Sequence, residues 1–293
     1  MRTTVQAAMI MTLFYAIILV TNFYLLSPLV SASPAAGIAS TKKVYRFGVV
    51  PQYGQRKLYR IWIPILVKLE KETGLKFELI GSAKIPDFEK RFLSGDFDFA
   101  YMNPYHVVSA NNRQGYMPLV RDGVRKLQGI LVVRKDSPIR AIQALSGKTV
   151  AYPSAYALGA SLLLRAELKR HYNIITKPRY VKTHSSVYLH VVQKLAVAGG
   201  GVRSTLDHQK PEIRNRVRII YKTQVLNPHP IVAHPRVPAE HMRRVQQALI
   251  KISRQSSGDK LLKKIPMRFV TKASLMDYDS VRKLKLGEIK DND

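Results

Sequence analysis

Short apolar stretches alternate with amphipathic ones from residue 44 onward. Residues 44–50 alternate β-forming side chains, which predicts a strand. Residues 55–73 then place apolar side chains at helical spacing, and Gly74 follows where a helix commonly ends in a left-handed turn. The strands expected here are residues 44–50, 77–80 and 97–102, and the helices are residues 55–73, 87–93 and a third that begins at Pro104. This β-α repeat is typical of an α/β fold with mostly parallel sheets covered by helices on both faces.

The same alternation returns after residue 128 and predicts a second α/β unit. Its expected strands are residues 129–133, 149–152, 179–182, 199–202 and 218–221, and the helices of the remaining chain are residues 157–172, 186–196, 239–254 and 277–284. The chain would pass from one unit to the other near residues 122–128 and back near residues 222–227, so the two units would form two connected lobes. We therefore expect a cleft between two sheets, because ligands of open α/β sheets bind beyond the carboxyl ends of the strands.

Three polar runs lie where a strand should give way to a helix: Tyr101–Tyr105, Tyr152–Tyr156 and Thr183–Ser186. A helix start attracts anions, because its first N–H groups lack intrahelical acceptors and its dipole favours negative charge. Ser, Thr and Asn also cap ordinary helices, so one such run would carry little weight. Three runs at strand ends predict one shared oxyanion pocket between the lobes.

The formal net charge of +29 indicates attraction to anions. The Lys and Arg residues are scattered and form no run of five, which favours a solvated basic surface. No nucleic-acid module accompanies them, so nucleic acid is not an expected partner. The chain contains no cysteine, which excludes disulfides, thiolate catalysis and cysteine-ligated metals.

Enzymatic and metal chemistry find little support in the sequence. There is no Gly-x-Ser-x-Gly motif and no carboxylate pair at strand ends. His184 and His190 are six residues apart, and His229 and His234 are five apart, so neither pair has the i, i+4 spacing of helical metal ligands. No catalytic residue, metal or cofactor is therefore expected, although an enzyme using the same cleft stays an alternative.

The first 32 residues differ from the rest of the chain. A nearly uncharged apolar stretch from Ala7 to Leu26 precedes Val30-Ser31-Ala32, a small-x-small cleavage signal. This pattern predicts a secretory signal peptide, although a stretch of about 20 apolar residues could also stay as a membrane anchor. Either outcome predicts that the body of the protein lies outside the cytoplasm.

Several segments resemble the successive signatures of the phosphonate, phosphate and phosphite-binding proteins of ABC importers, the PhnD-like family. The resemblance covers roughly residues 44 to 255 and keeps the family's order, and its segments are Gly48-Val49-Val50-Pro51, residues 95–101, residues 145–152, Thr183-His184-Ser185-Ser186-Val187 and residues 227–232. It implies a two-lobe type II periplasmic-binding-protein fold. Lobe one would comprise residues 44–124 and 226–293, and lobe two residues 128–222.

The resemblance also implies a set of ligand-binding residues. In the family the phosphoryl oxygens are held by a tyrosine, by Ser or Thr at a helix start and by the histidine of the Ser-His segment. Tyr101, Ser154 and His184 match these positions, and Tyr53 would lie on the wall of lobe one. The full expected set is Tyr53, Tyr101, Ser154, Ala155, His184, Ser185 and Ser186.

One departure from the family concerns the ligand's substituent. Family members that bind an aminoalkyl phosphonate carry an acidic residue where this chain has Ala198. An ammonium group would lose its counter-ion there, and a buried unpaired charge is costly. The departure favours a simple oxyanion such as phosphate or phosphite.

The resulting expectation is a monomeric periplasmic solute-binding protein that captures a small phosphorus oxyanion and delivers it to a membrane permease with its ATPase. An alternative is a sensory or accessory subunit that reports the same ligand to a membrane kinase or serves a redox complex.

Overall fold

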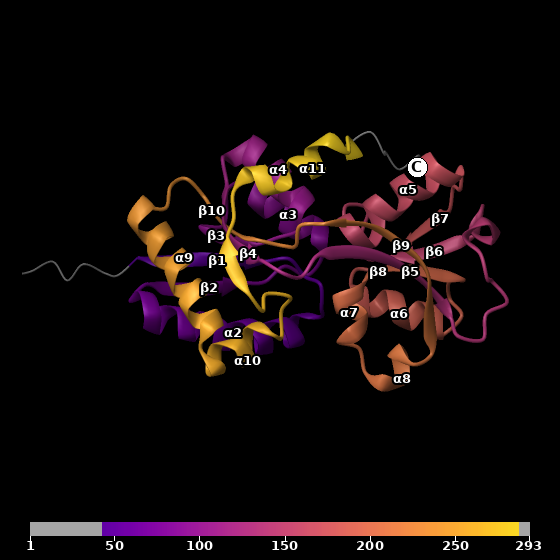
Figure 1. Ribbon diagram of the computed structural model, residues 1–293, viewed down its shortest axis with the longest axis horizontal. Helices are drawn as coiled ribbons and strands as arrows, with labels where there is room; N and C mark the ends of the chain where they lie inside the picture. Colours follow the sequence, from indigo (N-terminus) through magenta and orange to yellow (C-terminus); the bar gives the residue numbers. More distant parts are fainter. Residues whose placement is uncertain (1–42, 287–293) are drawn as a thin grey trace, which may run out of the picture. The chain divides into compact units, whose positions relative to one another are not determined.

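A computed structural model describes residues 43–286 of the chain (Figure 1). The expected signal peptide or anchor, residues 1–32, lies outside the described residues. Within residues 43–286, no helix is both long enough and apolar enough to cross a membrane.

The first sheet collects strands from the beginning and the end of the described chain. Its order across the sheet is β11 (Val270–Lys272), β4 (Met117–Asp122), β10 (Ile231–Ala233), β3 (Phe99–Tyr101), β1 (Val44–Val49) and β2 (Lys76–Ile80). The second sheet is built from the middle of the chain, with the order β7 (Lys177–Tyr180), β6 (Thr149–Tyr152), β8 (Ala198–Val202), β5 (Leu127–Arg134) and β9 (Val217–Leu226). The chain passes between the sheets from β4 to β5 and from β9 to β10.

Both sheets are mixed, so the expectation of mostly parallel strands is wrong in this detail. The pairs β1–β2, β1–β3, β6–β7 and β6–β8 are parallel, as the β-α repeat predicts. The remaining pairings, which involve β4, β5, β9, β10 and β11, are antiparallel. Each of these pairings contains β5, β10 or β11, which enter a sheet from the other sheet or from the C-terminal segment, and that entry direction is not encoded in their local sequence.

Helices cover both faces of each sheet (Figure 1). Around the first sheet they are α2 (Gln55–Thr73), α3 (Ile85–Leu93), α4 (Pro104–Gln114), α9 (Ala239–Arg254), α10 (Ser256–Leu262), a 3-10 turn (Leu275–Tyr278) and α11 (Asp279–Lys283). Around the second sheet they are a 3-10 turn (Ile142–Leu145), a π-helix (Leu158–Leu162) continued by α5 (Leu163–Tyr172), α6 (His184–Val192), α7 (Arg203–Asp207) and α8 (Pro211–Arg214). Helix α2 has the predicted bounds, and Gly74 ends it in the left-handed conformation at φ 68°.

Strand β5 shows how the core of the second sheet is divided between its two faces. Leu131 and Val133 pack in the cluster that includes residues of α5, whereas Ile130 and Val132 pack in the cluster that includes residues of α6. Successive side chains of a strand point to opposite faces, so an apolar run such as residues 129–133 is expected only where both faces are covered.

Candidate functional site

Two of the three polar runs cap helices. Asn103 precedes α4, and its side chain accepts a hydrogen bond from the backbone N–H of His106 at 2.9 Å. Thr183 caps α6 in the same way through the N–H of Ser186 at 3.1 Å, so this helix begins at His184, two residues earlier than predicted. The third run differs, because its helix begins only at Leu158 with a π-helical turn and Ser154 does not cap it.

A narrow pocket with a cavity volume of about 10 Å³ brings these helix starts together. It is lined by residues from both sheets and their helices: Val50, Gln52, Ile85, Asn103, Ala157, Leu158, Gly159, Ala160, His184, Val202 and His229. The first turn of the π-helix, at Leu158–Ala160, adds backbone N–H groups that have no acceptor within the helix. None of the lining residues is Lys, Arg, Asp or Glu, so the pocket offers neutral polar groups only.

Tyr101 and Ser154, two of the predicted ligand residues, are buried but are not part of this lining. Tyr101 is 1% exposed and Ser154 5%, and neither hydroxyl has a hydrogen-bond partner. The Tyr101 ring stacks on the pocket residue His229, with 5.3 Å between ring centres. Buried polar groups without partners are uncommon in proteins, and each calls for an explanation such as an absent ligand or water.

His184 lines the pocket, as the sequence predicted for a ligand residue. Its Nδ1 lies 3.3 Å from the Thr205 hydroxyl, which also lies 2.9 Å from the Val202 carbonyl. Burial lowers the pKa of the His184 imidazole to about 4, so the ring is neutral at neutral pH. Thr205 donates its hydroxyl proton to the Val202 carbonyl, so its oxygen can accept from Nδ1–H of His184, which makes Nε2 an acceptor. Nε2 becomes a donor when Thr205 turns its proton to Nδ1 instead.

His229 and Gln52 line the pocket and were not among the predicted residues. Their Nε2 atoms are 3.3 Å apart, and both side chains are buried. Burial, followed by the charges of His106 and His184, lowers the pKa of His229 to about 3. The sequence signal for His229 is its place in the segment 227–232, which we used only as a family marker.

The other predicted residues border the site without lining the pocket. Tyr53 is buried, which raises its pKa to about 12, and Lys57 Nζ lies 4.1 Å from the centre of its ring. The hydroxyl of Ser185 accepts from Gln209 Nε2 at 3.3 Å, and that of Ser186 is 2.9 Å from the Thr183 hydroxyl. Ala155 is half-buried between Ser154 and the pocket-lining segment.

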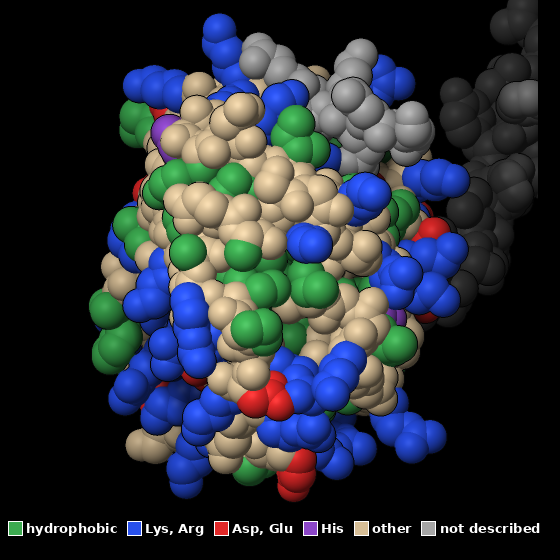
Figure 2. Space-filling view, turned by 90° about the vertical axis from the view of Figure 1, so that its right-hand side faces the viewer, with side chains coloured by type: hydrophobic (Ala, Val, Ile, Leu, Met, Phe, Trp, Pro, Cys, Tyr) green, Lys and Arg blue, Asp and Glu red, His purple; other side chains and the backbone are tan. Residues whose placement is uncertain are grey.

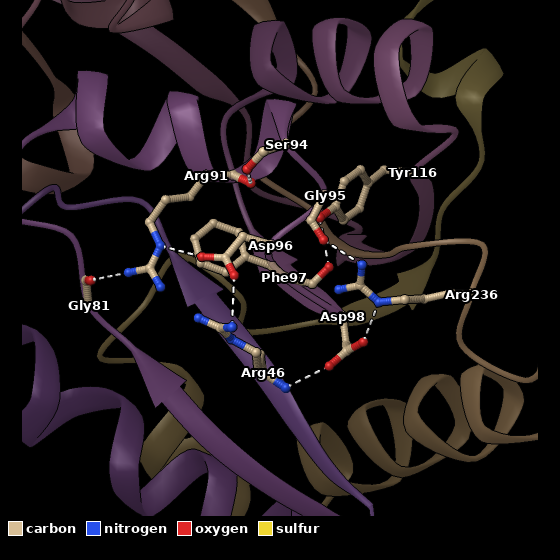
Figure 3. Close-up of polar contacts among 10 residues, drawn as sticks. All are labelled: Arg46, Gly81, Arg91, Ser94, Gly95, Asp96, Phe97, Asp98, Tyr116 and Arg236. Atoms are coloured by element: carbon tan, nitrogen blue, oxygen red, sulfur yellow. Dashed lines mark hydrogen bonds and ion pairs between the residues drawn. The ribbon is translucent and has the colours of Figure 1, made fainter.

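A network of charged groups fixes the loop that leads into β3 and so places Tyr101 (Figure 3). Asp98 is paired with Arg236 Nε at 2.7 Å and accepts from the backbone N–H of Arg46 at 2.9 Å. Arg46 also reaches Asp96 at 2.9 Å. The charged residues of the segment 95–101 therefore hold β3 against its neighbours.

The triple glycine of β8 lets helices approach the second sheet from both faces. A Cβ at Gly200 would lie 2.1 Å from the carbonyl oxygen of Ala160, in the π-helix beside the pocket. On the opposite face, a Cβ at Gly201 would lie 2.2 Å from the Tyr188 hydroxyl. Glycine is thus required at these positions because a side chain would collide with the packed helices, and at Gly200 this close approach sets the position of the π-helix.

Ala198 does not lie at the pocket. It is fully buried in β8, pairs with Val133 and Val150, and packs among apolar side chains. The argument against an ammonium-bearing ligand therefore depends on the pocket lining, which contains no carboxylate, and not on Ala198 itself. Within residues 43–286, no three His, Asp or Glu side chains are grouped as a metal site would require.

Comparisons with known proteins agree with this arrangement. Residues 47–278 match the family described as "ABC transporter, phosphonate, periplasmic substrate-binding protein". The phosphonates-binding periplasmic protein of Escherichia coli (strain K12) is 24% identical over 237 residues, which span 72% of this chain and 66% of that protein, just under two thirds of its length.

Two solved structures share the fold. A binding protein component of an ABC phosphonate transporter from Pseudomonas aeruginosa superposes with a TM-score of 0.77 at 16% identity, over 84% of this chain and 87% of that one. PhnD1 from Prochlorococcus marinus, in complex with methylphosphonate, gives a TM-score of 0.78 at 14% identity, over 85% and 100% of the two chains. The two-lobe periplasmic-binding-protein fold is confirmed. With the family match over most of its length, the chain belongs to the periplasmic substrate-binding proteins of phosphonate ABC transporters.

Proposed function

We propose that this protein binds a small phosphorus oxyanion, namely phosphate, phosphite or a phosphonate, in the pocket lined by His184 and His229. Residues 44–124 with 226–293 form one lobe and residues 128–222 the other. The protein works outside the cytoplasm as a monomer, without chemical turnover, and passes its ligand to a membrane permease and ATPase. Family membership supports the transport role.

The chemistry of the pocket supports an oxyanion. An imidazole, carboxamides and helix-start N–H groups can each donate to phosphoryl oxygens, and the charge of the ligand is then balanced by dipoles and not by an ion pair. Tyr101, Ser154, Ser185 and Ser186 supply hydroxyls around this pocket. Tyr53 and Ala155 lie next to pocket-lining segments in the sequence and would contact the ligand from there.

The observation that carries the proposal is that two predicted ligand hydroxyls, those of Tyr101 and Ser154, are buried without a hydrogen-bond partner. Tyr101 lies in β3 of the first sheet, and Ser154 follows β6 of the second. A hydroxyl that the protein leaves without a partner is available to a ligand, and a hydrogen bond to a charged group contributes about 1.5–3 kcal/mol.

Titration calorimetry with phosphate, phosphite, methylphosphonate and 2-aminoethylphosphonate tests the proposal. At least one of the first three should bind with saturable, one-to-one stoichiometry and without turnover. Tyr101→Phe should weaken that binding by about tenfold or more, because one charge-assisted hydrogen bond is lost. Its free energy of unfolding without ligand should not change, because the hydroxyl bonds nothing in the protein.

Tyr116→Phe is the matched control. The Tyr116 hydroxyl is also buried, but it donates to the Phe97 carbonyl at 2.7 Å. Its removal should lower the free energy of unfolding by about 1 kcal/mol and leave ligand affinity unchanged. Failure of the wild-type protein to bind any of the four compounds would overturn the proposal. Equal affinities for wild type and Tyr101→Phe would remove Tyr101 from the site.

A further inference from the structure

A second pocket, of about 310 Å³, adjoins the first. His229 lines both pockets, and Arg203 of the second directly follows Val202 of the first. Leu127, in the wall of the second pocket, lies next to the first as well, because a Cβ at Gly159 would be 3.3 Å from its side chain. We call these the inner and the outer pocket.

The outer pocket is cationic, unlike the inner one. Arg125, Lys126 and Arg203 line it together with a single carboxylate, Asp207. Asp207 is already paired with Arg203 at 2.9 Å, and Lys126 Nζ bonds the neutral side chain of Asn227 at 2.9 Å. With three cations and one anion, the pocket keeps two uncompensated positive charges.

We infer that the outer pocket receives a second anionic group of the ligand, so that this protein selects phosphonates whose substituent carries a carboxylate or another phosphoryl group. The inference rests on the proposed function, because it places the phosphoryl group in the inner pocket. The substituent would extend past His229 toward Arg203 and Arg125. An ammonium substituent would meet like charges there and find no carboxylate free to pair with it.

The inference is tested by comparing three phosphonates of similar size in calorimetry at neutral pH and low salt. Phosphonoacetate should bind about two- to fivefold more tightly than methylphosphonate, since partly exposed charge pairs contribute at that level. 2-Aminoethylphosphonate should bind more weakly than methylphosphonate. The advantage of phosphonoacetate should shrink as salt is added, because the outer pocket is open to solvent.

Variants separate the outer pocket from the charge of the whole protein. Arg125→Gln removes one of the uncompensated cations of the outer pocket, and it should reduce the phosphonoacetate advantage while methylphosphonate affinity stays as in the wild type. Lys210→Gln removes one charge from an exposed position that lines neither pocket, and it should leave the ratio unchanged.

The outcomes distinguish the two proposals. Equal affinities of the wild type for methylphosphonate and phosphonoacetate would overturn the outer-pocket inference and leave the proposed function standing. An equal loss of the phosphonoacetate advantage in Lys210→Gln and in Arg125→Gln would assign the effect to overall charge and also overturn it. Absence of binding to every phosphonate would overturn both.

Discussion

At the scale of single residues, the site is distinguished by imidazoles that burial keeps neutral. The pKa of His184 is lowered to about 4 and that of His229 to about 3, from an ordinary value of 6.5. Below about pH 6.5 the unfolded chain therefore takes up protons that the folded protein does not. The free energy of unfolding falls as pH drops from about 6.5 toward the folded pKa values, and this contribution is fully present only above pH 6.5.

This difference predicts a specific acid sensitivity. Between about pH 6.5 and pH 4.5, each buried imidazole should cost about 1–2 kcal/mol of unfolding free energy. In urea unfolding across this pH range, the free energy of unfolding of His184→Gln should fall by about 1–2 kcal/mol less than that of the wild type. Carboxylates titrate equally in both proteins and cancel in the comparison. Parallel stability curves would show that burial does not hold His184 neutral.

His184 could be predicted from sequence because it lies in a local run at a helix start. His229 could not, because its position depends on pairing between distant strands. Strand β10 runs antiparallel to β3 and pairs Ile231 with Tyr101, which brings His229 onto the Tyr101 ring. Gln52 reaches the pocket by a similar long-range contact. Local sequence patterns carry no information on such register.

At the scale of elements, the position of the π-helix depends on strand β8. Gly200→Ala would place a methyl group 2.1 Å from the Ala160 carbonyl oxygen and 2.6 Å from the Tyr152 ring. Neither neighbour can move easily, since one is backbone and the other a fully buried ring. We expect a loss of about 1–3 kcal/mol in unfolding free energy and weaker ligand binding, because the pocket-lining turn must shift.

Gly54→Ala is the control for this substitution. Nothing lies within 4 Å of a Cβ at Gly54, and its φ of −59° suits any residue. Its stability should stay within about 0.5 kcal/mol of the wild type in denaturant unfolding, with unchanged ligand affinity. Equal stability of the two variants would contradict the packing role assigned to Gly200.

The elements that local patterns predicted well are those with enough residues to show a period. Helix α2 spans 19 residues and α9 spans 16, and both have the expected bounds. Strands β10 and β11 have only three residues each and were not predicted. Such short strands are stabilised by their neighbours in the sheet and not by their own sequence, so no local signal marks them.

At the scale of the whole molecule, the alternating hydrophobic pattern predicted two α/β units connected by two chain segments. The mixed strand directions could not be predicted in this way, because they depend on strands that enter a sheet from distant parts of the chain. Composition predicted a basic surface, and Figure 2 shows that Lys and Arg outnumber acidic side chains on the face that it displays. The inner pocket, in contrast, has no charged side chain in its lining. Surface charge can therefore attract anions, while recognition is left to neutral donors.

Contacts between the two sheets' elements give the last prediction. The rings of Tyr105, in α4, and Tyr156, just before the π-helix, are stacked with 6.1 Å between centres and 11° between planes. Asn103 Nδ2 also donates to the Tyr156 carbonyl at 3.5 Å. Opening of the cleft would separate these groups, so we expect the stack to favour a closed arrangement over an open one.

Tyr156→Ala should therefore speed ligand dissociation about two- to tenfold, since an aromatic pair contributes about 0.5–1.5 kcal/mol. Combining it with Tyr105→Ala should add little further, because the first substitution already removes the stack. Tyr172→Ala breaks an aromatic contact with Tyr221 that stays beside the second sheet, and it should leave dissociation unchanged. Stopped-flow displacement measures the rates of the wild type, of these variants and of Tyr105→Ala alone. Fully additive effects of Tyr105→Ala and Tyr156→Ala would mean that the two rings act separately. Closure would then depend on other contacts, such as the hydrogen bond from Lys57 to the His208 carbonyl at 3.3 Å.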